Sequence, residues 1–537
     1  TTRPSVRLVV LAALAALVAL FALLPLLFMV AEAAQSGGSD ILRLVFRARV
    51  AELLGNTLRL VVVSTLLCGA LGASAAWLVE RTTLPGRRVW GPLLAAPLAV
   101  PAFVSSYGWV SLTPAVQGYA GAVLIVTLSY YPLVYLPVAA ALRGMDPALE
   151  ETARSLGHGP LRAFLRVVLP QLRPALGGGM LIVALHELAE FGAFQMLRFS
   201  TFTTAIYAEY QSSFDGPAAN LLAAVLVVAC LLLLMAELRL RGAGRYSRLG
   251  PGSARTVVRV RLGRAAPPAF ACLAALLALA LGVPVGSLIH WLVIGSSAVF
   301  PIGALASATV TSLGLGLAAA VVTTLLALPV ALLAERHRGR LAVLLERSTY
   351  VAHALPGIVI ALSLVFVAIH FAQPLYQSTP LLVAGYAILF LPMAMVGVRT
   401  GLAQTSPALT EAARALGNRP TTALRRVTLP LVAPGLGAAV ALVFLMVATE
   451  LTTTLLLAPI GTQTLATQVW SETGTLSYAA AAPYAALMVL ISAPAVYLLT
   501  RNQGKRMPYD HTVPDLGHQT LRRARGAARS GPAGASG

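Results

Sequence analysis

Long apolar stretches are the feature that most limits what this chain can fold into. Of its 537 residues, 58% are hydrophobic and 11% are charged, and the mean hydropathy is +0.81. A helix needs about 20 apolar residues to cross the hydrocarbon core of a bilayer. Twelve segments meet this need, with predicted bounds 6–30, 53–79, 90–113, 120–141, 175–196, 218–240, 268–292, 305–333, 344–371, 380–402, 432–458 and 479–499. The chain is therefore predicted to be an all-α polytopic membrane protein of about twelve transmembrane helices.

The first apolar segment, residues 6–30, allows two interpretations. Arg3 and Arg7 flank its start as in a secretory signal peptide, and a weak cleavage site follows at 31–34. The segment is longer than the apolar region of a signal peptide. We therefore expect a retained membrane anchor.

The positive charge of the chain, +20 in total, has a topological explanation. All but five of the 39 Lys and Arg residues lie in segments that we assign to the cytoplasm. Cytoplasmic loops of membrane proteins carry this excess, so both termini are expected in the cytoplasm. Nucleic-acid binding would require basic side chains interleaved with aromatic ones. The basic stretch 239–264 has one aromatic residue, Tyr246, and no nucleic-acid partner is expected.

An internal repeat divides the chain into two halves. Pro101 and Pro356 are 255 positions apart, and Glu190 and Glu450 are 260 apart. Six spans per repeat is an even number, which predicts two parallel six-helix repeats. The predicted divisions are an N-terminal repeat (1–240), a cytoplasmic linker (241–267), a C-terminal repeat (268–500) and a cytoplasmic tail (501–537) whose composition indicates disorder.

Each repeat contains one polar, arginine-bearing loop between two spans, at about 146–174 and 406–434. The copies read ETARSLG at 151–157 and EAARALG at 411–417. Helix-start signals precede them at Asp146-Pro147 and Ser406-Pro407. Gly157 and Gly417 are expected to end the first helix of each loop in a left-handed conformation. A second helix is expected to end at Pro170 and Pro430. An ordinary basic loop would not require these repeated spacings.

The loops resemble the signature loop of permease subunits of ATP-binding-cassette importers. The second copy fits its pattern: Glu-Ala-Ala, three residues, Gly, nine residues, a β-branched residue, one residue, Leu-Pro. The first copy departs at Thr152, where the family prefers Ala, and both copies have Val where Ile is commoner. The resemblance implies a type I importer transmembrane fold whose loops enter the clefts of two copies of a cytoplasmic ATPase. The coupling residues that it implies are Glu151, Ala153, Gly157, Glu411, Ala412, Ala413 and Gly417.

No catalytic residue is expected in this chain. The only lysine is Lys505, followed by Arg506, so no Gly-Lys-Ser/Thr phosphate loop exists. The chain is expected to bind no cofactor. In an ATP-driven system, ATP and Mg²⁺ would bind to the partner ATPase subunits.

Three glutamates lie near the ends of the spans that follow the loops: Glu187, Glu190 and Glu450. An ionisable side chain inside a membrane is a functional candidate by default. Glu190 and Glu450 are equivalent in the repeats and would offer a cation hard oxygen ligands. Alternatively, these helix ends reach the outer headgroups, where the carboxylates are hydrated or pair with Arg198. Both readings stay open for Glu190 and Glu450; the second is favoured for Glu187.

Aromatic residues are candidates for a function outside the membrane. Tyr207, Tyr210 and Trp470 follow spans five and eleven. They suit either the interfacial aromatic belt or a paired docking surface for an extracytoplasmic binding protein. For Tyr130, Tyr131 and Tyr135, which share one span, packing is favoured over lining a path.

The segments 190–207 and 450–470 resemble ferric-iron importers most, and fused thiamine permeases more distantly. The resemblance implies a permease in the bacterial cytoplasmic membrane that receives ferric iron from an extracytoplasmic binding protein. Thiamine or another small solute is the alternative substrate. A twelve-span secondary transporter is the alternative class, but it leaves the duplicated loops unexplained.

Overall fold

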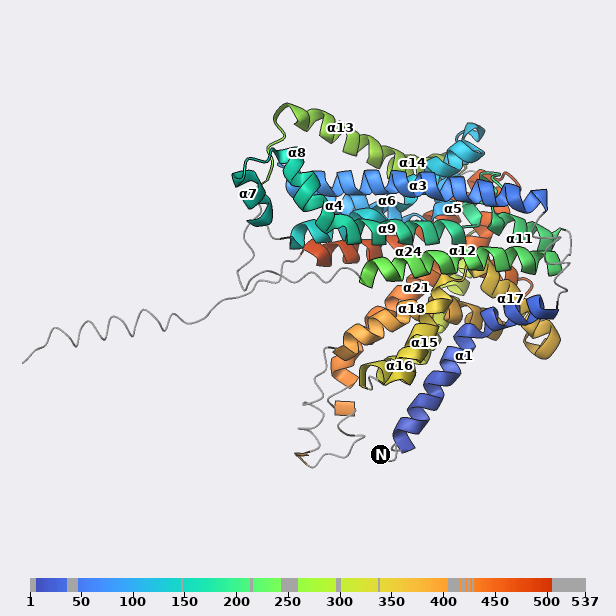
Figure 1. Ribbon diagram of the computed structural model, residues 1–537. Coiled ribbons are helices and arrows are strands. Elements are labelled where there is room, and N and C mark those ends of the chain that lie inside the picture. The colour runs from blue at the N-terminus through green and yellow to red at the C-terminus, as the bar shows by residue number, and fades with distance from the viewer. Residues whose placement is uncertain are drawn as a thin grey trace, which may run out of the picture.

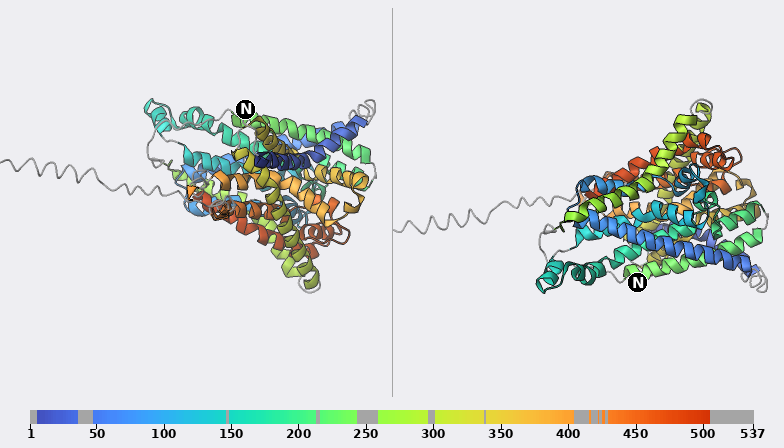
Figure 2. Two further views of the ribbon diagram at one scale, coloured as in Figure 1. Left: turned by 90° about the horizontal axis from the view of Figure 1, so that it is seen from below. Right: turned by 90° about the horizontal axis from the view of Figure 1, so that it is seen from above.

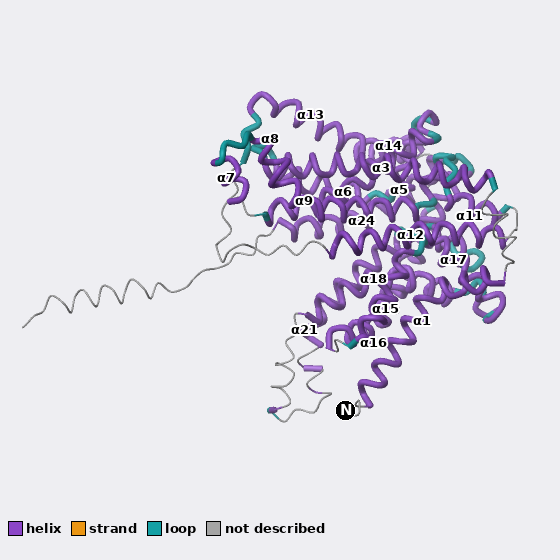
Figure 3. Tube along the Cα trace, viewed as in Figure 1, coloured by secondary structure: helices purple, strands orange, loops and turns teal. Residues whose placement is uncertain are grey.

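The structure, a computed structural model, describes residues 6–35, 47–145, 148–212, 216–242, 259–295, 301–336, 339–403, 415–416, 422, 425–426 and 429–504. In these ranges the regular structure is helical, apart from one isolated bridge between Thr82 and Val260 (Figure 3). Ten described helices are long and apolar enough to cross a membrane, and one bent pair would make an eleventh. The predicted all-α polytopic class is therefore confirmed.

The first repeat supplies the helices up to residue 242. In chain order they are α1 (Val6–Gln35), α3 (Ala48–Arg81), α4 (Arg87–Ala95), η1 (Ala96–Ala99), α5 (Ala102–Val110), η2 (Pro114–Val116), α6 (Tyr119–Gly144), α7 (Ala148–Ser155), α8 (Pro160–Ala163), η3 (Phe164–Val168), α9 (Leu169–Ala189), α10 (Gly192–Met196), α11 (Phe202–Gln211) and α12 (Gly216–Gly242).

The second repeat follows the same plan. Its described helices are η4 (Gly263–Ala265), α13 (Ala266–Leu277), η5 (Ala278–Gly282), α14 (Val283–Ile294), α15 (Ile302–Arg336), α16 (Arg340–Val351), η7 (Ala352–Ala354), α17 (Gly357–Phe371), η8 (Gln373–Leu375), α18 (Thr379–Ala403), α21 (Leu429–Ala448), α22 (Thr452–Leu457), α23 (Leu465–Gly474) and α24 (Tyr478–Gly504).

The long helices form two groups, each built mainly from one repeat. Helix α3 packs on α6 and α9, and α15 packs on α18 and α21. The groups approach each other around α11 and α17 and diverge toward α7 and α16 (Figure 1). They overlap when the molecule is seen from below or from above (Figure 2). We call the diverging end, which holds α7, the loop end, and the opposite end the meeting end. The molecule therefore has its two repeats joined at one end and spread at the other.

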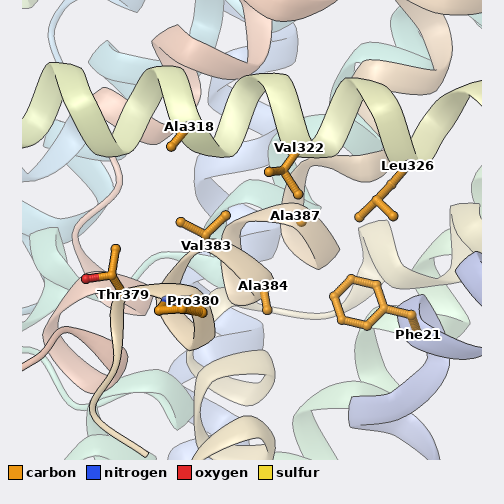
Figure 4. A pocket seen from close by; sticks show the side chains of 9 residues that line it. All are labelled: Phe21, Ala318, Val322, Leu326, Thr379, Pro380, Val383, Ala384 and Ala387. Atoms are coloured by element: carbon orange, nitrogen blue, oxygen red, sulfur yellow. The ribbon is translucent and has the colours of Figure 1, made fainter. Parts of the chain in front are cut away.

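The first span of each repeat packs on the other repeat. Helix α1 lies along α15, α16 and α17. Its Phe21 helps to line an apolar hollow of about 530 Å³ with Leu326 of α15 and Ala387 of α18 (Figure 4). In return, α14 packs on α5, and Phe270 of α13 meets the ring of Trp90 edge to face at 5.2 Å. This exchange ties the two repeats together by burial of apolar surface.

Two of the predicted spans are not single straight helices. Span 90–113 is a broken pair of helices, bent by 86° at Pro101. Span 344–371 is interrupted between α16 and α17, just before Pro356. The two breaks lie at equivalent positions of the repeats.

Proline is the cause of both breaks. It lacks an N–H group and drives the preceding residue out of the helical region. Val100 has φ −104° and ψ 109°, and Leu355 has φ −85° and ψ 122°, so both are extended. Helices α5 and α17, which follow the breaks, are largely buried. Irregular backbone at membrane depth is tolerated where protein surrounds it.

Spans five and eleven end earlier than predicted. The predicted bounds were 175–196 and 432–458, but α9 ends at Ala189 and α21 at Ala448. The chain turns at Glu190, whose ψ of 129° is extended. The carboxylates thus lie in the turns after the spans, and the short helices α10 and α22 follow.

Candidate functional site

Glu190 ends α9 and is fixed by hydrogen bonds from three sides. Its Oε2 accepts from the Tyr130 hydroxyl at 2.6 Å, and its Oε1 accepts from the Ala193 backbone N–H at 2.9 Å. The backbone carbonyl of Glu190 accepts from Thr203 Oγ1 at 2.6 Å. The residue as a whole is half-buried. The turn therefore holds the carboxylate in one orientation.

Glu450 has a similar turn in the second repeat. Its Oε1 accepts from both the backbone N–H and the hydroxyl of Thr453, at 3.0 and 3.1 Å. Its carbonyl accepts from Thr454 Oγ1 at 2.7 Å. Gly357, the first residue of α17, lies against it: a Cβ there would be 3.2 Å from Glu450 Oε1. In both repeats the carboxylate caps the backbone three residues further on.

The two turns contact each other at the meeting end. A Cβ on Gly192 would lie 2.9 Å from Leu451 Cδ2 and 2.9 Å from Phe103 Cβ. Gly192 and Leu451 come from different repeats. The structure thus brings together the turns that hold the two glutamates that the repeat predicted as a pair.

The alternative partner, Arg198, is not used. Its side chain is exposed, and within the described ranges it makes no ion pair with Glu190 or Glu450. Glu190 is paired with a tyrosine hydroxyl instead. A hydroxyl donor stabilises a carboxylate by a hydrogen bond without cancelling its charge.

Glu187 lies inside the bundle, one turn before Glu190 on α9. Its side chain is 1% exposed, and its Oε2 accepts from the Ser64 hydroxyl of α3 at 2.6 Å. Its Oε1 has no partner among the described residues. The structure therefore places Glu187 in a buried position between two helices and not in the hydrated position that we favoured for it.

The predicted docking aromatics pack at the contact between the repeats. Phe191 lies 4.6 Å from Tyr207 and 5.3 Å from Trp470 between ring centroids, and Tyr207 meets Trp470 at 6.4 Å. Tyr210 meets Phe366 of α17 edge to face at 6.5 Å. Tyr207, Tyr210 and Trp470 are half-buried. These side chains join the first repeat to the second, and each keeps an accessible part.

The first loop has the predicted helix that ends at Gly157. Helix α7 leaves Glu151 exposed and buries Ala153 to 6% exposure. Gly157 has φ +82°, its N–H donates to Arg154, and the N–H of His158 donates to Ala153. This pair of bonds is a Schellman motif, which needs a left-handed residue at the glycine position. The loop therefore presents a charged face on a glycine-capped helix.

The remaining coupling predictions lie outside the described residues. They are Glu411, Ala412, Ala413 and Gly417, together with the helix-start residues Asp146, Pro147, Ser406 and Pro407.

We expected the second helix of the first loop to end at Pro170, but it continues past this residue. Helix α8, the π-helical turn η3 and α9 run on as one helix. The Leu169 N–H bonds to the Phe164 carbonyl, five residues back. A π-turn changes the hydrogen-bond pattern just where the proline ring and its missing N–H would break an α-helix. The loop is thus continuous with a spanning helix.

Three hydroxyl groups at the site were not predicted from the sequence. Ser64, Thr203 and Thr453 each donate to a glutamate, and each comes from a different helix. Tyr130, for which packing was favoured, also binds a glutamate. The available signal was weak: a hydroxyl in an apolar helix often bonds to its own backbone.

Comparisons with known proteins agree on one class. The family described as "Binding-protein-dependent transport system inner membrane component" matches residues 20–239 and 327–507. The Fe(3+)-transport system permease protein FbpB 2 of Haemophilus influenzae is 40% identical over 482 residues, which are 88% of this chain and 94% of that protein.

Two further relatives align with smaller parts of the chain. The sulfate transport system permease protein CysT of Salmonella typhimurium is 32% identical over 38% of this chain and 82% of its own length. The molybdenum transport system permease protein ModB of Escherichia coli is 32% identical over 23% of this chain and 60% of its own length.

Proposed function

This chain belongs to the family of binding-protein-dependent transport system inner membrane components, and on that basis we propose that it carries ferric iron into the cytoplasm. It is a multi-pass permease of the ATP-binding-cassette class, and so a transport subunit rather than an enzyme. One observation supports iron above all: a relative named for Fe(3+) transport is 40% identical over 88% of the chain.

The energy would come from two copies of a separate ATPase. The chain's single lysine, Lys505, is not followed by Ser or Thr, so this subunit has no Walker phosphate loop. ATP and Mg²⁺ would bind only to the partners. The exposed face of α7, which carries Glu151, would enter a cleft of one ATPase copy. The second loop, with Glu411 and Gly417, would enter the other.

Movement of the two repeats would give alternating access. The groups of helices diverge at the loop end and touch at Gly192 and Leu451 at the meeting end. ATP-driven closure of the partners would draw the loop ends together and separate the glutamate turns. Such rigid-body rocking is a general mode of transporter function.

The carboxylates favour a cation over an anion. Ionised Glu190 and Glu450 are hard oxygen acceptors with no hydrogen to donate. They would attract ferric iron as it leaves the binding protein and repel an oxyanion such as sulfate. This distinction supports iron over the substrates named for CysT and ModB.

The loop end would face the cytoplasm of a bacterial cell, with both termini on that side. Positive residues of the loop, such as Arg154 and Arg162, fit this orientation. An extracytoplasmic binding protein would dock at the meeting end, on α11 and α23. Tyr207, Tyr210 and Trp470 would form part of that surface.

ATP hydrolysis in proteoliposomes tests the proposal. The chain would be reconstituted with its ATPase, and iron-loaded or thiamine-loaded binding protein would be added outside. We expect stimulation by the iron-loaded protein alone, together with uptake of radioactive iron. Stimulation only by the thiamine-loaded protein would show that the substrate is thiamine and not iron. Gradient-driven uptake by the chain without any ATPase would instead assign a secondary transporter.

A further inference from the structure

A groove runs along the first repeat from its middle to the loop end. It has a volume of about 890 Å³ and lies between α3 and α9. Six of its residues recur on one face of α3: Leu66, Gly69, Ala70, Ala73, Ser74 and Trp77. Leu172, Leu176 and Met180 of α9 form the opposite wall. The groove is therefore long, narrow and mostly apolar.

The groove is open toward the side of the bundle. Leu66, Ala70 and Ser74 are exposed, although they line it. The α3 residues from Leu66 to Arg81 span about 22 Å of helix, while one bilayer leaflet has about 15 Å of hydrocarbon. The groove is thus long enough for an acyl chain that enters sideways from the membrane.

Arg81 lies at the loop end of this groove and lacks a full set of partners. Its side chain is 5% exposed, and one contact is described for its guanidinium: Nη1 to Glu150 Oε2, at 3.5 Å. Its Nε and Nη2 have no hydrogen-bond partner among the described residues. A guanidinium has five N–H donors, and burying it with unpaired donors is costly.

The surroundings of Arg81 hold it at the groove. Its backbone carbonyl accepts from the N–H of Val260 at 2.9 Å, and Val260 also lines the groove. Glu150 belongs to α7, the coupling helix. Arg81 therefore lines a space bounded by α3, α9, the first loop and the stretch at Val260, and Glu150 lines the same space.

We propose that this groove binds an anionic phospholipid of the loop-end leaflet, with its phosphate on Arg81 and one acyl chain between α3 and α9. A phosphate supplies the acceptors that the buried guanidinium lacks, in bidentate geometry. Arginines between transmembrane helices bind anionic headgroups in this way, and here Glu150 stays at Nη1 and leaves Nε and Nη2 for the phosphate. The leaflet is cytoplasmic if the orientation of the proposed function holds, but binding itself does not depend on transport.

Tryptophan fluorescence tests the site, because Trp77 lies in the groove. The full chain would be reconstituted in phosphatidylcholine bilayers with rising fractions of brominated phosphatidylglycerol, or of brominated phosphatidylcholine as the reference. The Trp77→Phe variant gives the signal of the other four tryptophans. We expect the Trp77 signal to be half-quenched at a several-fold lower fraction of phosphatidylglycerol. Equal quenching by the two lipids would overturn the proposal.

Three variants separate the contribution of the lipid headgroup from that of its acyl chain. Arg81→Gln should abolish the preference for phosphatidylglycerol. Ala73→Phe keeps the arginine but fills the groove, and should remove most quenching of Trp77. Val63→Phe, at an exposed position of α3 outside the groove, should change neither. A preference that survives Arg81→Gln in a folded protein would contradict the proposal.

Competition distinguishes a lipid from a free anion. Millimolar glycerol phosphate should leave the quenching by brominated phosphatidylglycerol unchanged, because the acyl chain contributes to binding. Relief of quenching by glycerol phosphate would assign Arg81 to a soluble anion and reject the lipid. Neither result bears on ATP-driven iron uptake, so a failure here is separable from a failure of the proposed function.

Discussion

Gly192 of the first repeat packs against Leu451 of the second, and each lies within two residues of a half-buried glutamate. A Cβ on Gly192 would be 2.9 Å from Leu451 Cδ2 and 2.9 Å from the Cβ of Phe103. The meeting end is therefore closed by direct contact between the two glutamate turns. A glycine is needed because a side chain there has no space on the Phe103 side.

Substituting Gly192 by Ala should destabilise this closed arrangement. The new methyl group would overpack the contact with Phe103, at a cost of about 1–3 kcal/mol. Gly178→Ala in α9 is the matched control, since nothing lies within 4 Å of a Cβ there. That control should be neutral or stabilising by roughly 0.5–1 kcal/mol. Thermal unfolding of the detergent-solubilised chain measures both, and equal melting temperatures would refute the contact.

Much of the fold could be predicted from local pattern. Apolar length gave the spans, and the two repeats followed from the spacing of residues such as Pro101 and Pro356. The left-handed Gly157 was predicted from its place after a helical segment and has φ +82°. These features depend on a few neighbouring residues, so a single sequence contains them.

Two of the features that failed depend on tertiary contacts, whereas the bend at Pro101 has a local cause that the apolar pattern concealed. Uniform apolar composition across 90–113 hides the 86° bend, because α5 is as apolar as a straight span would be. The exchange of α1 between repeats leaves no trace in its own sequence. The Tyr130 hydroxyl reaches Glu190 from 60 positions away, and only packing of α6 near α10 creates that hydrogen bond.

Neutralising the paired carboxylates should slow iron transport without preventing assembly. Glu190→Gln keeps the oxygen that caps Ala193 and removes the charge, and Glu450→Gln does the same at Thr453. We expect each change to lower iron flux about tenfold, or ~1.4 kcal/mol in the barrier. Radioactive iron uptake and co-purification with the ATPase are the two measurements.

Two controls make the carboxylate prediction specific. Tyr130→Phe removes the hydroxyl that orients Glu190 but leaves the charge, so flux should fall less than in Glu190→Gln. Glu52→Gln removes an exposed charge of α3 whose described partner is Arg49, and should leave flux unchanged. Unchanged iron flux in both Glu190→Gln and Glu450→Gln would exclude the glutamates from the path.

The glycine cap of the first coupling loop should be required for energy coupling. Gly157→Ala forces a Cβ into a left-handed conformation at a cost of about 1–2 kcal/mol, although nothing lies within 4 Å of it. The cost therefore comes from the local backbone conformation and not from contact with neighbouring residues. Gly159→Ala, with equal space and no positive φ, is the control.

We expect Gly157→Ala to reduce stimulated ATP hydrolysis while the complex still assembles, and Gly159→Ala to behave as wild type. In the second loop, Gly417→Asp should uncouple hydrolysis from uptake in the same way. The ratio of stimulated to basal hydrolysis is the readout. Normal stimulated uptake in both variants would count against the coupling function of these loops.

The aromatic contact between the repeats should stabilise the meeting end. The rings of Phe191 and Trp470 are 5.3 Å apart, and Tyr207 packs on both. A double-mutant cycle with Phe191→Leu and Trp470→Leu should give a coupling of about 0.5–1.5 kcal/mol, as for other aromatic pairs. Leu490→Ala, at an exposed position of α24, is the control and should not couple.

The same tryptophan tests the docking surface. Trp470→Phe keeps a ring against Phe191 and should keep the melting temperature, but it loses the indole N–H and part of the accessible area. If the binding protein docks on α23, the concentration of loaded binding protein for half-maximal ATPase stimulation should rise several-fold. An unchanged half-maximal concentration, in a variant that is as stable as wild type, would limit Trp470 to joining the repeats.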